Sequence, residues 1–142
     1  MVRISDKDLF LIETLTENAR TAFVKIAEKL NVSETTIRKK VKQLLKEGVI
    51  EKFTLQLNPK KLGFEITGLI GIDTKPEAYV QTLEELKQLR EVKKLWSTTG
   101  DHMIMAECWF KNSSELMQFI KKLEFNPNIT KVCPAIIVER LK

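Results

Sequence analysis

The stretch Ser33-Glu34-Thr35-Thr36-Ile37-Arg38-Lys39-Lys40-Val41-Lys42-Gln43-Leu44-Leu45-Lys46-Glu47-Gly48 decides how the N-terminal part of this chain folds. Its apolar residues recur at i, i+4, i+7 and i+8, the spacing that gathers side chains on one face of an α-helix: Ile37, Val41, Leu44 and Leu45. Ser33 is of a type that caps helix starts, and Gly48 is of the type that ends helices. The spacing therefore predicts a helix that runs to Glu47, with one apolar face and one basic, hydrogen-bonding face.

Two shorter helices are predicted upstream of this stretch. Ser5 followed by Asp8 is a capping-box pattern and predicts a helix over about residues 6–17. Thr21 is expected to cap a second helix, which ends at a tight turn at Asn31 and Val32. The apolar positions again follow helical spacing: Leu9, Phe10, Leu11, Ile12 and Leu15 in the first helix, and Phe23, Ile26, Ala27 and Leu30 in the second.

Two helices joined by a short turn, the second beginning with hydroxyl and basic side chains, are typical of a helix-turn-helix that places its second helix in the major groove of DNA. Such side chains suit both base edges and phosphates. A merely solvated helix face is the alternative, but five of the six basic residues between positions 33 and 52 lie within the helix. For base edges and groove-facing phosphates we expect Ser33, Thr35, Thr36 and Arg38 or Lys39, with Lys40 and Lys42 nearer the DNA backbone.

The positive charge is concentrated in the same half of the chain. Residues 1–61 hold 13 Lys and Arg against 8 Asp and Glu, whereas residues 62–142 hold 11 of each. The whole net charge of +5 therefore belongs to the first part. This division predicts a module that binds a polyanion, joined to a neutral module with another task.

After Gly48 the pattern changes from helical spacing to alternation. The apolar residues Val49, Ile50, Phe53, Leu55 and Leu57 predict a linking strand, which ends at Asn58-Pro59 and is followed by a turn to Gly63. One side of this strand is too apolar to stay exposed. We expect it to pair with its copy in a second chain or to pack against the second module.

From Ile66 onward, strands and helices alternate in the order β-α-β-β-α-β. The predicted strands are 67–72, 92–99, 102–110 and 131–139, with a tight turn at Gly100-Asp101; Pro76 opens one helix, and Asn112 with Glu115 caps the other. The helices are expected to bury Val80, Leu83, Leu86 and Leu89, and Leu116, Phe119, Ile120 and Leu123, respectively. This order is ferredoxin-like, and Pro134 places the last strand at an edge or a bulge. The predicted fold class is α+β: a winged-helix-like, three-helix domain followed by a ferredoxin-like domain.

The sequence contains no catalytic or metal-binding pattern that would indicate an enzyme. His102 has no nucleophile nearby, and Cys108 and Cys133 lack CxxC spacing, so we interpret His102 as a partly buried or cleft-lining residue and the cysteines as core residues. Trp96 and Trp109 are expected to be core or interface anchors. We expect no cofactor. Because 43% of residues are apolar and 30% charged, with no apolar run long enough to span a bilayer and no signal peptide, we expect a soluble, cytoplasmic protein.

Taken together, the motifs resemble the leucine-responsive regulator and AsnC, or feast/famine, family of transcription factors. They occur in this order: Asp8 with Ile12 and Leu15; Ala19-Arg20-Thr21; Val32 to Leu44; Gly48-Val49-Ile50; Asn58-Pro59 with Leu62-Gly63; and Thr99-Gly100-Asp101. The resemblance covers nearly the whole chain. It implies a helix-turn-helix domain over 1–48, a linking strand and hinge over 49–63, and an effector-binding and oligomerisation (RAM) domain over 64–142.

The resemblance also implies partners. Family members dimerise through the sheet faces of the RAM domain, often assemble further into tetramers or octamers, and bind small effectors, usually amino acids, between RAM domains near the turn that corresponds to Gly100-Asp101. The candidate effector-binding residues are therefore Thr98, Thr99, Gly100, Asp101 and His102. The family often has Gly-Asp-x-Asp at this turn, but Met103 stands where the second carboxylate would be. Because of this departure, the sequence does not determine the identity of the effector. The alternative is that Gly100-Asp101 is an ordinary hairpin turn without a ligand.

Three functions are consistent with these patterns. We favour a sequence-specific transcriptional regulator that acts as a homodimer or larger assembly on a roughly palindromic DNA site and is controlled by a small effector. The second is an architectural protein that wraps DNA with little sequence preference. The third is an enzyme on the ferredoxin-like module, such as an acyl-phosphate hydrolase, but the second half shows no anion-cradling loop with a positioned arginine.

Overall fold

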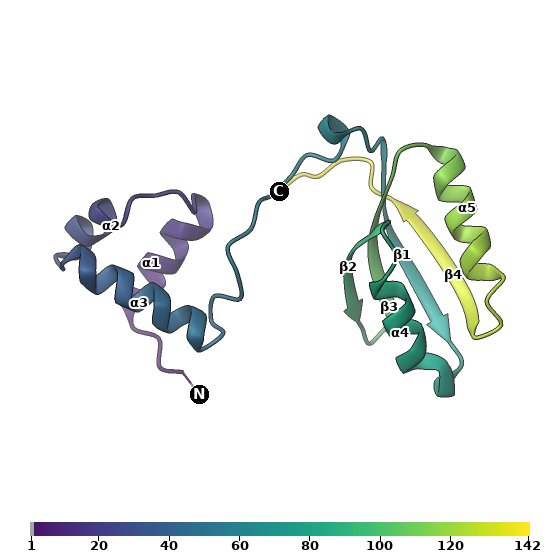
Figure 1. Ribbon diagram of the computed structural model, residues 1–142, viewed down its shortest axis with the longest axis horizontal. Helices are drawn as coiled ribbons and strands as arrows, with labels where there is room; N and C mark the ends of the chain where they lie inside the picture. The colour runs from purple at the N-terminus through teal and green to yellow at the C-terminus, as the bar shows by residue number, and fades with distance from the viewer. Residues whose placement is uncertain (1) are drawn as a thin grey trace. The chain divides into compact units, whose positions relative to one another are not determined.

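The computed structural model describes residues 2–142, which form two compact units that divide between Gln56 and Leu57. The first unit contains three helices: α1 (Asp6–Glu17), α2 (Phe23–Leu30) and α3 (Glu34–Lys46). Their apolar stripes meet in one core, made of Leu11, Leu15, Ile26, Ala27, Ile37, Val41 and Leu44. Figure 1 shows the path of the three helices, of which α3 is the longest.

The helix starts in this unit follow the predicted caps in two of three cases. Ser5 and Asp8 form a reciprocal capping box at α1, and Ser33 caps α3 by accepting the Thr36 N–H. The prediction that Thr21 caps α2 is wrong: Ala22 is the N-cap residue. The Thr21 hydroxyl donates to the Asn18 carbonyl instead, because the loop between α1 and α2 satisfies its own backbone groups.

The predicted linking strand over residues 49–57 is wrong for the single chain. No strand forms there, and the side chain of Leu55 is 79% exposed. A strand exists only where a neighbour supplies the other half of its hydrogen-bond ladder, and none of the described segments does so.

The second unit is a four-stranded antiparallel sheet with two helices, and it begins with the short helix η1 (Lys60–Leu62). The strands are β1 (Ile66–Thr74), β2 (Val92–Ser97), β3 (Ile104–Phe110) and β4 (Ile129–Ile136), in the spatial order β2-β3-β1-β4. The helices are α4 (Tyr79–Lys87), which follows the short η2 (Pro76–Ala78), and α5 (Ser113–Glu124). The β-α-β-β-α-β order and the edge position of Pro134 are both confirmed.

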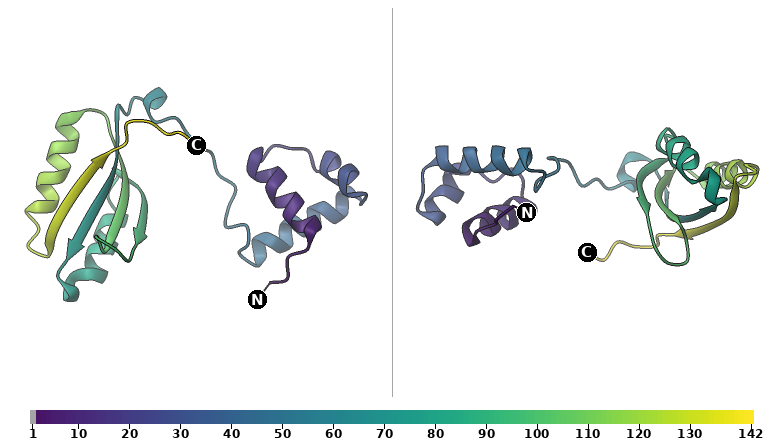
Figure 2. Two further views of the ribbon diagram at one scale, coloured as in Figure 1. Left: turned by 180° about the vertical axis from the view of Figure 1, so that it is seen from behind. Right: turned by 90° about the horizontal axis from the view of Figure 1, so that it is seen from below.

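Both helices cover the same face of the sheet, as Figures 1 and 2 show. Alternate residues of β1 and β3, such as Ile70 and Ala106, pack there against Leu86, Phe119 and Leu123. The residues between them therefore point to the other, uncovered face of the sheet.

Three details of the second unit differ from the prediction. Val80 is 70% exposed, because the Pro76 turn is a separate short helix and the inward side of α4 is formed by Thr82 and Leu86. The connection between β2 and β3 is a loop over residues 98–103, not a tight turn at Gly100-Asp101, because Ser97 and Ile104 are the last paired residues. The last strand begins at Ile129 and ends at Ile136.

Candidate functional site

The exposed side of α3 carries most of the residues predicted to bind DNA. Thr35, Arg38, Lys39 and Lys42 are exposed, while the opposite face of the helix is buried in the core of the first unit. Lys46, which was not among the predicted DNA-binding residues, is also exposed and continues this basic side by one helical turn beyond Lys42. Its spacing from Lys39 and Lys42 was the signal that could have identified it.

Ser33 and Thr36 form the start of the helix. The Ser33 Oγ accepts the Thr36 N–H at 3.1 Å, and the two hydroxyl oxygens lie 2.8 Å apart. Both residues are exposed. Their hydroxyls therefore have a structural task as well as any contact they make with a ligand.

Arg38 is held in place by two neighbours. Its Nη2 lies 2.6 Å from the Glu34 Oε1, and its guanidinium stands 5.6 Å from the ring centroid of Phe23. An exposed ion pair of this kind stabilises a protein by about 0–1 kcal/mol, so the guanidinium can leave Glu34 for a stronger partner at little cost.

Lys40 differs from the other basic residues of α3. Its Nζ lies 3.2 Å from the Oδ1 of Asp8, whose side chain is buried, and the Asp8 Oδ2 accepts the Ser5 N–H at 2.9 Å. Burial acts to raise the pKa of Asp8, but the hydrogen bonds from Ser5 and the contact with Lys40 outweigh it and hold this pKa below its ordinary value. Lys40 therefore joins the start of α1 to α3, a role that the local sequence did not indicate.

The predicted effector-binding residues lie on the loop between β2 and β3. Thr98 closes this loop: its N–H donates to the Met103 carbonyl at 3.0 Å and its hydroxyl to the His102 carbonyl at 2.6 Å. Thr99, Gly100 and Asp101 are exposed, and Gly100 has a φ of 146°, a conformation that favours glycine.

His102 is the partly buried member of this set, as predicted, and it is anchored to β1. Its Nδ1 lies 3.0 Å from the Asp73 Oδ2, and the Met103 N–H donates to the Asp73 Oδ1 at 2.8 Å. Burial acts to raise the pKa of Asp73, but the bonds from His102 and Met103 and the charge of Lys131 outweigh it and lower this pKa. Asp73 was missed because it lies 29 residues before His102 in the chain.

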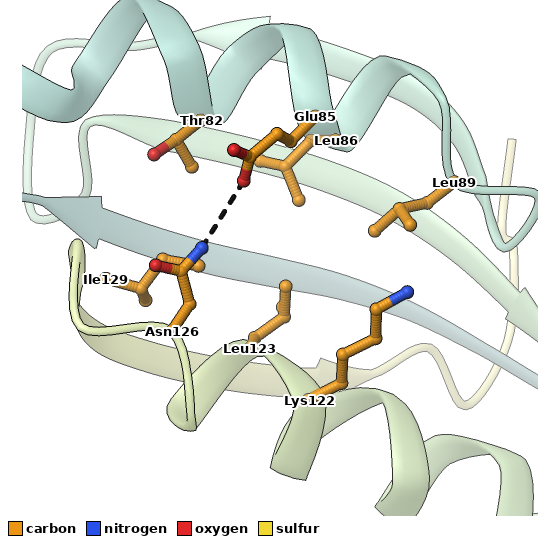
Figure 3. Close-up of a pocket in the computed structure, with 8 residues that line it drawn as sticks. All are labelled: Thr82, Glu85, Leu86, Leu89, Lys122, Leu123, Asn126 and Ile129. Carbon is orange, nitrogen blue, oxygen red and sulfur yellow. Dashed lines mark hydrogen bonds between the residues drawn. The ribbon is translucent and has the colours of Figure 1, made fainter.

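A shallow cavity lies elsewhere in the second unit, between α4 and α5 (Figure 3). Its lining includes Glu85 and Asn126, which are hydrogen-bonded at 3.4 Å, and the apolar residues Leu86, Leu89, Leu123 and Ile129. It contains none of the predicted effector-binding residues.

The described residues hold no group of three or more side chains suited to a metal ion. Cys108 is free and buried, and burial raises the pKa of its thiol to about 12, so it is an inert core residue as predicted. Cys133 is free and half-buried. Within residues 2–142, no helix has both the length and the apolar character needed to cross a membrane.

Comparison with known proteins gives the same division of the chain. Residues 4–51 match the winged helix-turn-helix DNA-binding family, and residues 67–142 match the Lrp/AsnC ligand binding domain family. The HTH-type transcriptional regulator LrpA of Pyrococcus horikoshii is 44% identical over 140 residues, covering 98% of this chain and 99% of that protein. LrpA1 of Halobacterium salinarum is 35% identical over 133 residues, covering 93% and 94%.

Solved structures show the same fold over the full chain. The structure of E. coli AsnC superimposes with a TM-score of 0.87 at 28% identity, covering 99% of this chain and 96% of that chain. A transcriptional regulator of Neisseria meningitidis, solved as a complex with L-Met, gives 0.89 at 17% identity, covering 99% and 93%.

A helix-turn-helix with an exposed basic helix, joined to a ligand-binding domain, defines a DNA-binding transcriptional regulator. The chain belongs to the Lrp/AsnC family of these regulators. The predictions of family, fold class and function are confirmed. Since its relatives are transcriptional regulators, the prediction that the chain is not an enzyme is confirmed as well.

Proposed function

We propose that residues 1–48 bind duplex DNA through the exposed side of α3, that residues 49–63 are the link, and that residues 64–142 bind an effector and assemble the oligomer. The single observation that carries the DNA proposal is the division of α3 into a buried apolar stripe and an exposed side with Thr35, Arg38, Lys39 and Lys42. Thr35, Arg38 and Lys39 read base edges, and Ser33, Thr36 and Lys42 contact phosphates. Lys40 acts mainly by holding α3 against Asp8.

We propose that the chain assembles as a homodimer through the uncovered face of the sheet. Leu69, Met105 and Trp109 alternate with the core residues and so point to this face, and Trp96, paired with Met105, is 43% exposed. Exposed apolar surface of this kind favours a protein partner. Dimers then assemble into tetramers or octamers, and the residues around Leu55 pair with the same segment of the second chain.

Met105→Glu tests the assembly. It places a charge in the proposed interface, and we expect light scattering to show a lower mass. Val80→Glu, on the exposed side of α4, is the matched control and leaves the mass unchanged. An unchanged mass for Met105→Glu contradicts this interface.

A dimer presents two recognition helices, and major-groove faces recur about 34 Å apart on one side of the duplex. The DNA site is therefore roughly palindromic. The test is selection of bound sequences from a random pool, and we expect an enriched motif with two half-sites. Binding without any enriched motif would instead favour the architectural, DNA-wrapping alternative.

We propose that a small molecule, an amino acid in the first instance, binds between RAM domains at the loop formed by Thr98, Thr99, Gly100, Asp101 and His102. The exposed Asp101 carboxylate suits an α-ammonium group, and Gly100 allows close approach of the backbone. The protein acts in the cytoplasm, and the effector alters DNA binding through its different affinities for the assembly states.

Calorimetry against the twenty L-amino acids tests the effector site. L-methionine is a natural first probe, because the N. meningitidis protein of the same fold was solved with it. We expect Asp101→Ala to weaken binding at least tenfold. Binding that is unaffected by this change places the site elsewhere, and repeating the DNA selection with the bound amino acid tests the coupling.

A further inference from the structure

The imidazole of His102 lies flat against the backbone of β1. A Cβ atom at Gly71 would collide with the Cγ, Cδ2 and Nε2 atoms of this ring, so only glycine at position 71 leaves room for it. The side chains of His102 and Asp73 are each 18% exposed, and their contact is 3.0 Å. The ring is therefore packed on one side and bonded at Nδ1, with its orientation set by β1.

The bond to Asp73 determines which nitrogen of His102 carries the proton. The pKa of Asp73 is lowered, so near neutral pH its carboxylate is ionised and can only accept hydrogen bonds. Lys131, opposite Asp73 on β4, also favours the ionised form. The Nδ1 of His102 must then be the donor, and a neutral imidazole with a proton on Nδ1 has an unprotonated, hydrogen-bond-accepting Nε2.

The Nε2 atom has no hydrogen-bond partner among residues 2–142, although the side chain is only 18% exposed. No fully buried side-chain nitrogen or oxygen in the described chain lacks a partner, so Nε2 is within reach of solvent or a ligand. It lies on the loop that also carries Asp101, the single carboxylate between positions 98 and 103.

We propose that Asp73 and Gly71 hold His102 as the Nδ1–H tautomer, so that Nε2 accepts a hydrogen bond from the protonated amine of the effector. This inference rests on the proposed effector site at residues 98–102 and narrows its ligand to a cationic N–H donor. Asp73 is a positioning residue, since it acts through His102.

Nitrogen NMR tests the proton position directly, because the chain contains one histidine. With ¹⁵N-histidine incorporated into the full chain, the two imidazole nitrogens report which one is protonated. In the neutral ring we expect Nδ1 to be protonated and Nε2 unprotonated. In Asp73→Asn the amide oxygen can keep the Met103 N–H while the amide NH₂ donates to Nδ1, so we expect the tautomer to reverse. Glu84→Gln removes an exposed carboxylate from α4, which covers the other face of the sheet, and leaves the histidine signals unchanged.

The role of Nε2 in ligand binding is tested with L-methionine and N-acetyl-L-methionine. If another amino acid binds the wild-type protein better, that amino acid and its own N-acetyl derivative are used instead. We expect the acetylated probe, which has no cationic amine, to bind at least tenfold more weakly than the amino acid. We expect Asp73→Asn to weaken the amino acid by a similar factor while the circular dichroism spectrum stays unchanged.

The outcomes separate the two proposals. Two results would overturn the role of His102 but not the proposed effector loop. One is an Nε2–H tautomer in the wild type. The other is wild-type affinity in Asp73→Asn together with loss of binding in Asp101→Ala. If no amino acid binds, or if Asp101→Ala binds normally, the effector loop itself fails, and the ligand role of Nε2 fails with it. The tautomer of the free protein then still decides whether Asp73 orients the ring.

Discussion

The contact between Asp8 and Lys40 is the connection in the DNA-binding unit whose removal has the clearest expected effect. Asp8→Asn keeps the shape of the side chain and an oxygen for the Ser5 N–H, but it removes the charge that faces the Lys40 ammonium at 3.2 Å. Lys40→Met removes the same interaction from the other side. The two variants and their combination form a double-mutant cycle.

The magnitude follows from the burial of the two groups. A hydrogen bond to a charged group contributes about 1.5–3 kcal/mol, and breaking a fully buried ion pair costs about 3–5 kcal/mol. Asp8 is 3% exposed, but the Lys40 side chain is 33% exposed and can turn toward water. We therefore expect Asp8→Asn to lower the free energy of unfolding by about 2 kcal/mol and Lys40→Met to lower it by about 1–2 kcal/mol. The coupling energy between the two changes should be about 1 kcal/mol.

The assay can assign this loss to one unit of the full chain. Both tryptophans, Trp96 and Trp109, lie in the second unit, so their fluorescence follows the sheet, while far-ultraviolet circular dichroism also follows the helices of the first unit. In urea unfolding, we expect the dichroism transition to move to lower urea and the fluorescence transition to stay in place. For a unit of this size, a loss of 2 kcal/mol lowers Tm by roughly 10 °C.

The pH dependence gives an independent check. The folded pKa of Asp8 lies below its ordinary value of 3.8, so the stabilisation is present above the unfolded pKa and is lost as pH falls through the folded one. The difference between the wild type and Asp8→Asn should therefore be largest near neutral pH and should shrink below about pH 4. A coupling near zero, or a difference that does not change with pH, would refute this reasoning.

Three further predictions concern DNA recognition, the histidine anchor and the core. Arg38→Ala should weaken DNA binding and reduce sequence preference by about 1–3 kcal/mol at one base position. Lys42→Ala should weaken binding to cognate and random DNA alike and reduce the slope of log affinity against log salt concentration by about 1. Fluorescence anisotropy with both DNAs at several salt concentrations checks this, and equal losses on cognate and random DNA for both variants contradict it. Gly71→Ala should lower the free energy of unfolding by about 1–3 kcal/mol through overpacking and should displace the His102 ring. Calorimetric unfolding and the ¹⁵N-histidine signals would detect these two effects. Unchanged histidine signals would contradict the contact between Gly71 and His102. Phe119→Ala should lower the free energy of unfolding by about 3–5 kcal/mol, because this ring is buried against Phe110 at 5.2 Å between centroids. The tryptophan-detected urea transition measures this loss. A loss below about 1 kcal/mol would be inconsistent with a packed core.

The alternation of elements and the faces of the long helices could be predicted from the chain alone. Ser5, Ser33 and Asn112 cap their helices as expected, because a cap is a contact between residues about three apart. Thr21 has a side chain equally suited to capping α2, but its hydroxyl donates to the nearby Asn18 carbonyl instead. The apolar alternation around Leu55 likewise predicted a strand that the single chain does not form.

The candidate sites divide in the same way. The basic side of α3 was predicted from residue spacing and the loop at Gly100-Asp101 from the family resemblance, whereas the partners of Lys40 and His102 were not predicted. Asp8 and Asp73 lie far from these residues in the chain and meet them only through helix packing and sheet register. Local spacing determines caps, helix faces and the order of elements, because those depend on neighbouring residues; only the tertiary structure decides which distant carboxylate meets which cation or imidazole, because those contacts form when separate elements pack.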